Sequence, residues 1–562
     1  MVRMNLPPQA PEPAPSRISP VPVRTSWDHV RPIRIAPRHE HFHCWVEIEH
    51  SRPETIGDVV LTLYEIDALL PPQSIRLQVD SQNPRRFTAA WPIPPHPAGF
   101  NGYLSWQSLD SEQTFTVPGE LRLSIVPDDL EKLRIYTMIP RAAGSIAHWD
   151  RLFHHAYELG FNAIHLLPLN LCGSSQSPYA IQDHRLIHPE LSDHLSPDQF
   201  RTRLVELAQQ YDLRLFCDLV LNHVSCDSPL TASSPQWFEP DSSSPTGFRQ
   251  AGWWEGSHFH TWSDTAALRF HPPVESHRRD LWEYLAAYAE FWASAAQATG
   301  GGVRFDNYHA TDPHFSRWLS RRLLQRFPAL IRYSEYFAPY EIMYRRIFTD
   351  RIHITLATPW QHKFVPQLRD YTRHLHDYAP LLPFHTPLNS HDTGSPEREF
   401  GSRANLYPRI ALTAFLMPGT WGLTMGTEYD LPHAIPFRGP VQPLSLQPDP
   451  IFMSAIQQTN SVLQQFPEAT TQPGEIHWLD AGHPAVIAAL RIHEKATILV
   501  IANFDSRPHS LTLTPCERMP SRKPALTIAC PPAATSDNPL PPTLPGGTVE
   551  CAPNSAFVLI WP

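Results

Sequence analysis

The chain has 562 residues, 42% of them hydrophobic and 18% charged, so it is long enough for several domains and at least one complete core. Its net charge of -10 is opposite in sign to the basic surface that nucleic acids bind, and no apolar run reaches the length of a membrane span. We therefore expect neither a nucleic acid nor a membrane as a partner.

The first 25 residues are rich in proline and contain no apolar segment of the kind that a signal peptide needs. This composition predicts a disordered leader over residues 1–25 on a cytoplasmic protein. The seven cysteines of the chain are scattered and form no C-x-x-C pair, so neither a disulfide framework nor a zinc site is predicted.

Residues 26–128 alternate between apolar and polar side chains in short runs that Pro, Asn and Ser interrupt. Strands at this spacing, with no helical pattern between them, predict an N-terminal β-sandwich. His39, His41 and His43 would share one strand face there and could hold a metal. With 31 histidines in the chain and no carboxylate or cysteine partner beside these three, we predict no metal site.

Residues 129–465 change to an alternation of strand and helix. One helix is expected to begin at a Ser145 cap and end at Gly160, and another spans residues 199–211. Eight buried strands can be placed, at residues 134–139, 161–169, 213–221, within 301–309, 329–335, 352–356, 381–388 and 420–425. This pattern predicts an α/β fold, a (β/α)8 TIM barrel, with an inserted loop region at about 222–276. Residues 466–562 return to strand patterns and are expected to form a C-terminal β-domain.

Polar side chains follow several of the predicted barrel strands, where barrels of this kind keep their active sites. Asp218 ends the third strand, Arg304 and Asp306 end the fourth, Glu335 ends the fifth, and Asp392 follows the seventh. An arginine beside an aspartate can hold that carboxylate ionised, and an ionised carboxylate can act as a nucleophile. The set therefore predicts a catalytic ring.

These motifs, in this order, resemble those of the α-amylase superfamily, the retaining α-glucan enzymes. The resemblance rests on D-x-x-x-N-H at residues 218–223, G-x-R-x-D at 302–306, a lone glutamate at 335 and H-D at 391–392. It implies Asp306 as nucleophile, Glu335 as general acid and base, and Asp392 as stabiliser of the distorted sugar. Residues of the implied substrate-binding set are Tyr179, Asp218, His223, Arg304, His309 and His391.

A narrower resemblance concerns the residues after the fourth strand. His309 stands three places after Asp306, whereas many amylases have Lys-His at the third and fourth places. This form is similar to the glucanotransferase half of glycogen debranching enzyme, and it implies a 4-α-glucanotransferase acting on α-1,4-glucans or maltooligosaccharides. Three alternatives stay open: an α-amylase-type hydrolase, a maltosyl-transferring enzyme and an inactive glucan-binding member.

The resemblance also implies how the site is protonated. Glu335 should carry a proton, its pKa raised by two neighbouring aspartates, while Arg304 keeps Asp306 ionised. No cofactor is expected. Asn222 stands where some relatives bind calcium, but no further ligands are evident and no metal is predicted. The sequence gives no indication of oligomeric state.

Overall fold

The computed structural model describes residues 17–27, 33–35, 39–255, 257–429, 431, 433–444, 447–513, 517–531 and 548–562. The chain divides into two compact units. One comprises Met1–Leu130, Arg317–Ala329 and Pro339–His353, and the other comprises Glu131–Ser316, Leu330–Ala338 and Ile354–Pro562. Residues 1–16 of the predicted leader lie outside the described residues. The end of the first domain at residue 128 and the limits 129–465 and 466–562 stay our proposal for the domain boundaries.

The first unit contains the predicted β-sandwich. β6 links its two layers, because residues 73–77 pair with β5 whereas residues 78 and 79 pair with β7. Alternating side chains of both layers meet in one core that includes Val46, Leu61, Phe100 and Leu123. The strands are β1 Arg17–Ile18, β2 Val23–Thr25, β3 Ile33–Ile35, β4 His41–Ile48, β5 Ile56–Glu65, β6 Gln73–Val79, β7 Arg86–Pro92, β8 Ala98–Ser108, β9 Gln113–Thr116 and β10 Leu121–Ile125.

The leader prediction is wrong for residues 17–25. β1 pairs with β9 and β2 pairs with β4, so this segment adds two strands to the sandwich. Val21 and Val23 also pack against the sandwich core. Proline content alone misled the prediction, because isolated prolines are tolerated at strand ends and sheet edges.

His41 and His43 share the outer face of β4, where both side chains are exposed. Their ring centroids lie 6.1 Å apart. Alternate residues of the same strand, such as Phe42 and Cys44, face the core. The predicted strand face is therefore present for His41 and His43, whereas His39 precedes the strand.

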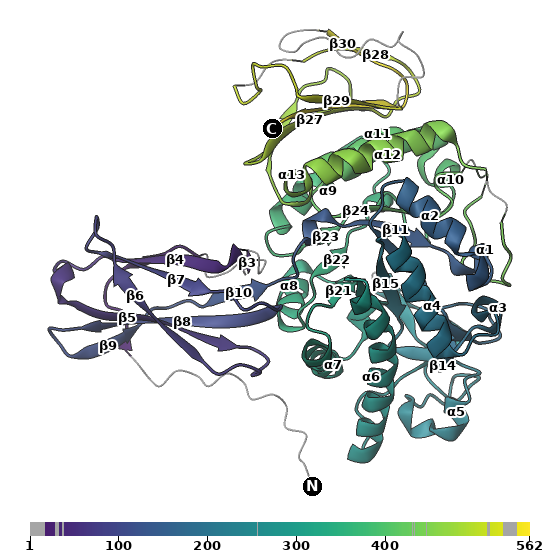
Figure 1. The fold of residues 1–562 in the computed structure, drawn as a ribbon, viewed down its shortest axis with the longest axis horizontal. Helices are drawn as coiled ribbons and strands as arrows, with labels where there is room; N and C mark the ends of the chain where they lie inside the picture. The colour runs from purple at the N-terminus through teal and green to yellow at the C-terminus, as the bar shows by residue number, and fades with distance from the viewer. Residues whose placement is uncertain are drawn as a thin grey trace. The chain divides into compact units, whose positions relative to one another are not determined.

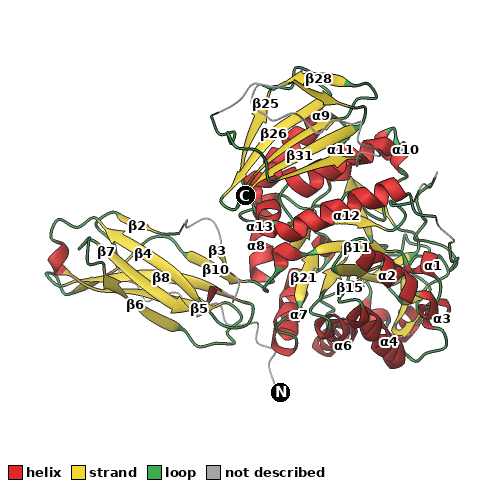
Figure 2. Cartoon of the chain, turned by 45° about the horizontal axis from the view of Figure 1, so that its top comes forward, coloured by secondary structure: helices red, strands yellow, loops and turns green. Residues whose placement is uncertain are grey.

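The second unit contains a barrel of eight parallel strands, which confirms the predicted fold class (Figures 1 and 2). Their order is β23, β22, β21, β20, β15, β12, β11 and β24, and a parallel bridge between His385 and Thr420 closes the ring. The bounds are β11 Arg134–Met138, β12 Ala163–Leu166, β15 Arg214–Leu219, β20 Gly302–Phe305, β21 Ile331–Ser334, β22 Ile354–Leu356, β23 Phe384–His385 and β24 Trp421–Thr424.

Strand seven is much shorter than expected. The sequence predicts residues 381–388, but β23 covers only Phe384–His385. Pro383 and Pro387 flank it, and a proline has no N–H to donate to a neighbouring strand. The hydrophobic run is largely buried as predicted. Hydrogen bonds to the neighbouring strands continue beyond β23, since the Leu388 N–H donates to the Gly422 carbonyl oxygen at 2.8 Å.

Helices alternate with the barrel strands in the chain, and α4 and α6 pack against β15. Ser196 caps α4, since its Oγ accepts the Gln199 N–H at 3.3 Å and the Gln199 side chain accepts the Ser196 N–H at 3.0 Å. Ser145 instead precedes a short 3-10 turn, and the α-helix begins at Asp150. The main helices are α2 Asp150–Glu158, α4 Pro197–Gln210, α6 Glu275–Ala298, α7 Pro313–Arg326, α8 Tyr340–Thr349, α9 Val365–Tyr378, α11 Leu406–Ala411 and α12 Pro450–Gln465.

The predicted insertion after β15 has some structure of its own. β16 His223–Ser225 pairs with β19 Thr265–Ala267, and these two strands bring the ends of the insertion together. Between them, β17 Gly252–Glu255 and β18 His258–Thr261 form an antiparallel hairpin. The insertion is followed directly by α6.

The C-terminal part is a five-stranded antiparallel sheet accompanied by a two-stranded one. Arg491 on β26 is fully buried and donates to the carbonyl oxygens of Phe415 and Thr470, so it links this sheet to the last helices of the barrel. The predicted strands near residues 485, 496 and 556 are present. The strands are β25 Glu475–Leu479, β26 Val486–His493, β27 Ala496–Asn503, β28 His509–Thr512, β29 Leu526–Cys530, β30 Thr548–Cys551 and β31 Ser555–Trp561.

Candidate active site

The candidate catalytic residues come together at the carboxyl ends of three neighbouring barrel strands. Asp218 on β15 stands beside Arg304 on β20 in the strand register. Asp306 and Glu335 each follow their strand directly, and their backbone N–H groups continue the ladder by donating to Leu219 and Phe305 at 3.0 Å. Strand order alone therefore gathers these side chains at one end of the barrel.

Arg304 is the centre of this group. Its Nη1 lies 2.6 Å from Asp218 Oδ2 and 3.3 Å from Asp306 Oδ1, and its Nη2 lies 3.0 Å from Glu335 Oε2. The guanidinium is buried, and although burial alone would lower its pKa, the surrounding carboxylates raise that pKa well above its usual value. One fixed cation thus holds three carboxyl groups in place.

The chain after β20 is shaped to hold Glu335. Asn307 has a left-handed backbone conformation, with φ 45°, which Asn adopts more readily than most residues. Its N–H donates to Glu335 Oε2 at 3.0 Å. Tyr308, the next residue, donates its N–H to the Glu335 carbonyl oxygen at 2.8 Å. The segment following Asp306 therefore fixes both the side chain and the backbone of Glu335.

The protonation of the two carboxyl groups differs from the sequence prediction. Burial raises the pKa of Asp306 well above its ordinary value, and the negative charge of Glu335 raises it further. Burial would also raise the pKa of Glu335, but the Arg304 charge and the Asn307 N–H together lower it. The prediction of an ionised Asp306 beside a protonated Glu335 is wrong for this arrangement, because Arg304 also contacts Glu335.

Asp218 lies beneath this pair, and its side chain is fully buried. The charge of Arg304 and the neighbouring His165 lower the pKa of Asp218 against the effect of burial. Asp218 is therefore an ionised anchor for Arg304. His165 is a contact that the sequence analysis missed, and its Nε2 lies 3.4 Å from Asp218 Oδ2.

Tyr179 and His391 form the adjacent wall. The Tyr179 hydroxyl donates to Asp218 Oδ2 at 2.9 Å and lies 2.8 Å from His391 Nε2. The two rings are stacked, with centroids 5.4 Å apart. Burial raises the pKa of Tyr179 well above its usual value, so the hydroxyl keeps its proton and its role as a donor. Residues from three distant parts of the sequence thus form one polar network.

His223 and His309 both line the same cavity. Burial lowers the pKa of His223 to about 4, so its ring is neutral at neutral pH. Its Nδ1 lies 2.9 Å from Asn222 Oδ1, so the Asn222 amide oxygen already has a hydrogen-bond partner within the protein. A neutral imidazole at a cavity wall can exchange hydrogen bonds with neutral polar ligands.

The cavity has a volume of about 570 Å³, within the size range of small-molecule sites. Asp306 and Glu335 line its base. Asp392 also lines it, but its side chain is 57% exposed, in contrast to the buried Asp306. Aromatic side chains that surround the opening are Trp253, Trp254, Trp262, Phe337 and Phe437.

Some lining residues were not singled out from the sequence. Phe337 follows Glu335 by two places, and Gln361 lies in the loop after β22. Phe437 and Arg438 lie in the irregular segment after β24. The only available signal was their position just after a barrel strand, because loops carry no periodic pattern.

A family model described as the glucanotransferase domain of glycogen debranching enzyme matches residues 127–245. This segment runs from the first barrel strand into the insertion and includes the D-x-x-x-N-H motif. A solved structure of a cyclomaltodextrinase matches 92% of this chain and 96% of its own, with a TM-score of 0.59 and 16% identity. Residues 127–245 are thus similar to a glucanotransferase domain, and the fold is similar to that of the cyclomaltodextrinase. The motifs that resemble those of the α-amylase superfamily stand in the order and at the strand ends described above.

Curated relatives add a second likeness. An alpha-1,4-glucan:maltose-1-phosphate maltosyltransferase of Salinibacter ruber is 24% identical over 402 residues, or 63% of this chain and 55% of that protein. The enzyme of the same name from Myxococcus xanthus is 26% identical over 247 residues, 38% of this chain and 34% of that protein. The chain thus spans between about a third and just over half the length of these two relatives.

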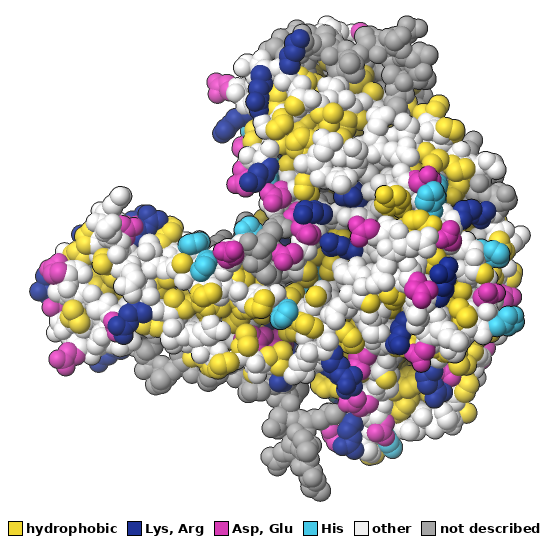
Figure 3. All heavy atoms as spheres, in the orientation of Figure 1, with side chains coloured by type: hydrophobic (Ala, Val, Ile, Leu, Met, Phe, Trp, Pro, Cys, Tyr) yellow, Lys and Arg dark blue, Asp and Glu magenta, His cyan; other side chains and the backbone are white. Residues whose placement is uncertain are grey.

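Two observations bear on partners. None of the helices in the described part of the chain is long and apolar enough to cross a membrane. Cationic and anionic side chains are interspersed among the described residues on the face drawn in Figure 3. Among the described residues, that face therefore carries no basic stripe of the kind that nucleic acids bind.

Proposed function

We propose that this chain is a retaining 4-α-glucanotransferase that moves segments of α-1,4-linked glucan through a glycosyl-enzyme on Asp306. The observation that carries the proposal is the Arg304 guanidinium, which holds Asp306 and Glu335 side by side at the base of the cavity. Retaining enzymes keep their two carboxyl groups about 5 to 5.5 Å apart, whereas inverting enzymes leave room for a water molecule between them. Asp306 and Glu335 both contact the Arg304 guanidinium, and this closeness of the two carboxyl groups supports a retaining enzyme.

In the proposed reaction, Glu335 gives its proton to the glycosidic oxygen as the bond from that oxygen to C1 breaks. The Asp306 carboxylate bonds to C1 and forms the glycosyl-enzyme. An acceptor hydroxyl then loses its proton to Glu335, and its oxygen bonds to C1 as Asp306 leaves. Asp392 stabilises the positive charge that develops on the sugar ring, and Arg304 holds the nucleophile in position.

This sequence of steps needs the proton on Glu335, whereas the free site favours it on Asp306. A bound sugar therefore has to move the proton before reaction. A glycosidic oxygen that accepts a hydrogen bond from Glu335 favours the protonated form of this residue. Weakening the contact between Glu335 and Arg304 has the same effect, while the remaining contact with Arg304 favours the ionised form of Asp306.

Transfer requires that a sugar rather than water meets the glycosyl-enzyme. Aromatic faces at the cavity opening suit sugar rings, and Trp253 and Trp254 are 42% and 65% exposed there. The match of residues 127–245 to a glucanotransferase domain supports the same outcome. An α-amylase-type hydrolase is the alternative if water reaches the intermediate first.

Incubation with maltoheptaose tests the proposal. A transferase yields both longer and shorter α-1,4 chains with little net rise in reducing ends, because each transfer breaks one glycosidic bond and makes another. Reducing ends that rise in step with substrate consumption, with no product longer than the substrate, would indicate a hydrolase. Binding of maltoheptaose without turnover would indicate an inactive glucan-binding member.

A maltosyl phosphate donor is the second candidate. Both curated relatives carry a name that specifies maltose-1-phosphate, and Arg438 places a cation in the cavity wall where a phosphate could bind. Incubation with maltose-1-phosphate and a glucan acceptor distinguishes the two donors. Release of inorganic phosphate with chain extension favours the maltosyltransferase, and no release together with activity on maltoheptaose favours the glucanotransferase.

A further inference from the structure

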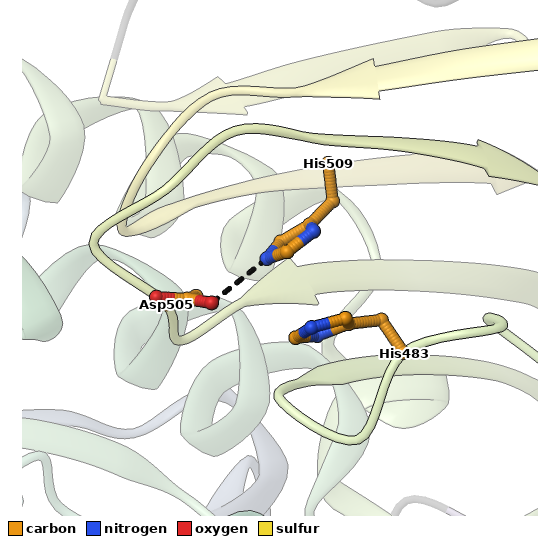
Figure 4. Close-up of side chains that lie close together, drawn as sticks. All are labelled: His483, Asp505 and His509. Atoms are coloured by element: carbon orange, nitrogen blue, oxygen red, sulfur yellow. Dashed lines mark hydrogen bonds and ion pairs between the residues drawn. The ribbon is translucent and has the colours of Figure 1, made fainter.

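Three side chains with metal-binding groups meet at one end of the C-terminal β-domain (Figure 4). His483 lies in the loop between β25 and β26, Asp505 lies in the loop after β27, and His509 begins β28. Their ligand atoms all lie within 4.8 Å of one another. All three side chains are half-buried, so solvent can reach them.

The loop that carries Asp505 and His509 is held by a buried amide. Asn503 is fully buried and donates from Nδ2 to the carbonyl oxygens of Arg507 and Ala552, at 2.9 and 2.8 Å. Its Oδ1 accepts the Asp505 N–H at 2.9 Å. This support fixes the approach of Asp505 Oδ2 to His509 Nε2, which lie 2.9 Å apart. The first two ligand groups are therefore preorganised.

The third group approaches from the neighbouring loop. The ring of His483 stacks on that of His509, with centroids 3.7 Å apart and planes 28° apart. The Ala485 N–H donates to His483 Nδ1 at 3.2 Å and orients the ring. Coordination requires the two rings to open so that both lone pairs meet at one point, a movement that half-buried loop side chains can make.

We propose that His483, Asp505 and His509 form a binding site for a divalent transition metal, with Zn²⁺ as the best fit. Two imidazoles and one carboxylate suit zinc, which takes N and O ligands at about 2.0 to 2.2 Å in tetrahedral geometry. Ca²⁺ and Mg²⁺ prefer oxygen ligands and suit this set poorly. Three protein ligands leave the fourth position to water. A ring that is protonated before binding releases one proton to solvent when the metal takes its place.

The site is separate from the candidate active site, and the proposal is independent of the glucan chemistry. Metal binding would cross-link the two loops that meet at this end of the domain. A ligand that binds only the folded state stabilises it in proportion to the logarithm of its concentration. The expected consequence is a C-terminal domain whose thermal stability depends on Zn²⁺.

The experiment is a Zn²⁺ titration of the full chain after treatment with a chelator, followed by calorimetry. With 31 histidines in the chain, weak surface binding is expected, so the comparison between variants decides the result. His477→Ala is the matched control, because His477 Nε2 also lies close to a carboxylate, 2.9 Å from Glu475 Oε1, but outside the cluster. Wild type and His477→Ala should each bind one tight equivalent of Zn²⁺.

His509→Ala and His483→Ala should lose that equivalent or bind it at least about tenfold more weakly. Circular dichroism in chelator checks that each variant is folded, and Asp505→Asn serves as a further variant that keeps the size of the side chain. Zn²⁺ should raise the melting temperature of wild type but not that of His509→Ala. Equal Zn²⁺ binding by wild type and a folded His509→Ala would overturn the proposal, as would displacement of Zn²⁺ by equimolar Ca²⁺.

Discussion

The cavity of the barrel has two regions that differ in burial and in the way they are held. The floor, defined as Asp218, Arg304, Asp306 and Glu335, consists of charged groups joined by contacts of 2.6 to 3.3 Å to one guanidinium. The rim, defined as Trp253, Trp254, Phe337 and Asp392, consists of side chains that are 42 to 65% exposed.

This difference separates two aspects of the proposed reaction. Charges in a buried, preorganised floor act strongly on bond making and breaking, because little solvent screens them. Exposed groups at a rim act on which molecule enters the site, and each contributes less. We therefore expect floor substitutions to change the rate and substitutions of the rim aromatics to change the product distribution, whereas Asp392, which is proposed to stabilise charge on the sugar, should affect the rate.

The largest effect should come from removing the proposed nucleophile. Asp306→Asn should reduce turnover of maltooligosaccharides by several orders of magnitude, because the amide cannot form the glycosyl-enzyme. Steady-state assays with maltoheptaose measure this loss. Asp370→Asn, an aspartate whose side chain is 75% exposed on α9, is the control and should retain wild-type activity. Wild-type turnover by Asp306→Asn would remove this residue from the mechanism.

The other floor carboxyl should show a donor-dependent loss. Glu335→Gln should stall on glucans, whose leaving group needs a proton, and should still form a glycosyl-enzyme from an α-glycosyl fluoride, whose leaving group needs none. Mass spectrometry of the protein after brief exposure to the fluoride detects the intermediate. An equal loss on both donors would assign Glu335 a structural role through its contact with Arg304.

The sequence predicted the floor better than the rim. Asp218, Arg304, Asp306 and Glu335 follow buried strands, and the order of parallel strands brings strand ends together whatever the loops do. The contact between Arg304 and Glu335 could not be predicted, because three carboxyl groups compete for one guanidinium and side-chain conformations decide the outcome. The resulting pKa directions were therefore wrong in the sequence analysis.

The positions of the rim side chains are set by loop conformation, and loop sequences have no periodic pattern from which that conformation can be predicted. Trp253 and Trp254 lie in the insertion that was predicted after the third strand, but no pattern in that loop marked them as cavity residues. In the fold, prolines account for two of the differences. Pro383 and Pro387 flank the short β23, and the proline-rich start concealed the strands formed by residues 17–25.

Rim substitutions should change the fate of the glycosyl-enzyme. Trp253→Ala and Trp254→Ala should each lower turnover by less than about tenfold, since a stacked aromatic contributes roughly 0.5 to 1.5 kcal/mol. The ratio of transfer to hydrolysis should fall at the same time, as an acceptor sugar loses its stacking surface. Chain-length profiles and reducing-end assays on maltoheptaose measure both quantities.

Phe364→Ala is the matched control for the rim, because Phe364 is 69% exposed but does not line the cavity. It should leave both turnover and the product ratio unchanged. A tryptophan variant that loses turnover a thousandfold while keeping its product ratio would place that residue with the floor and contradict the division proposed above.

The smallest effect concerns stability rather than rate. The pKa of Asp306 is raised in the folded protein, mainly by burial and then by the charge of Glu335, above the value of about 3.9 that an unfolded aspartate has. At a pH below both pKa values the Asp306 carboxyl is protonated in the folded and the unfolded state, so it does not change the free energy of unfolding. As the pH rises through the folded pKa, ionisation inside the buried floor destabilises the folded state, by about 1.4 kcal/mol for each unit of the shift.

Asp306→Asn removes this destabilisation, so the variant should unfold at a higher denaturant concentration than wild type at pH 8, with the difference shrinking towards pH 4. Asp370→Asn should show no such trend. A variant that is less stable than wild type at pH 8 would mean instead that Arg304 needs the Asp306 charge, so that the floor is held together by this ion pair more strongly than burial opposes it.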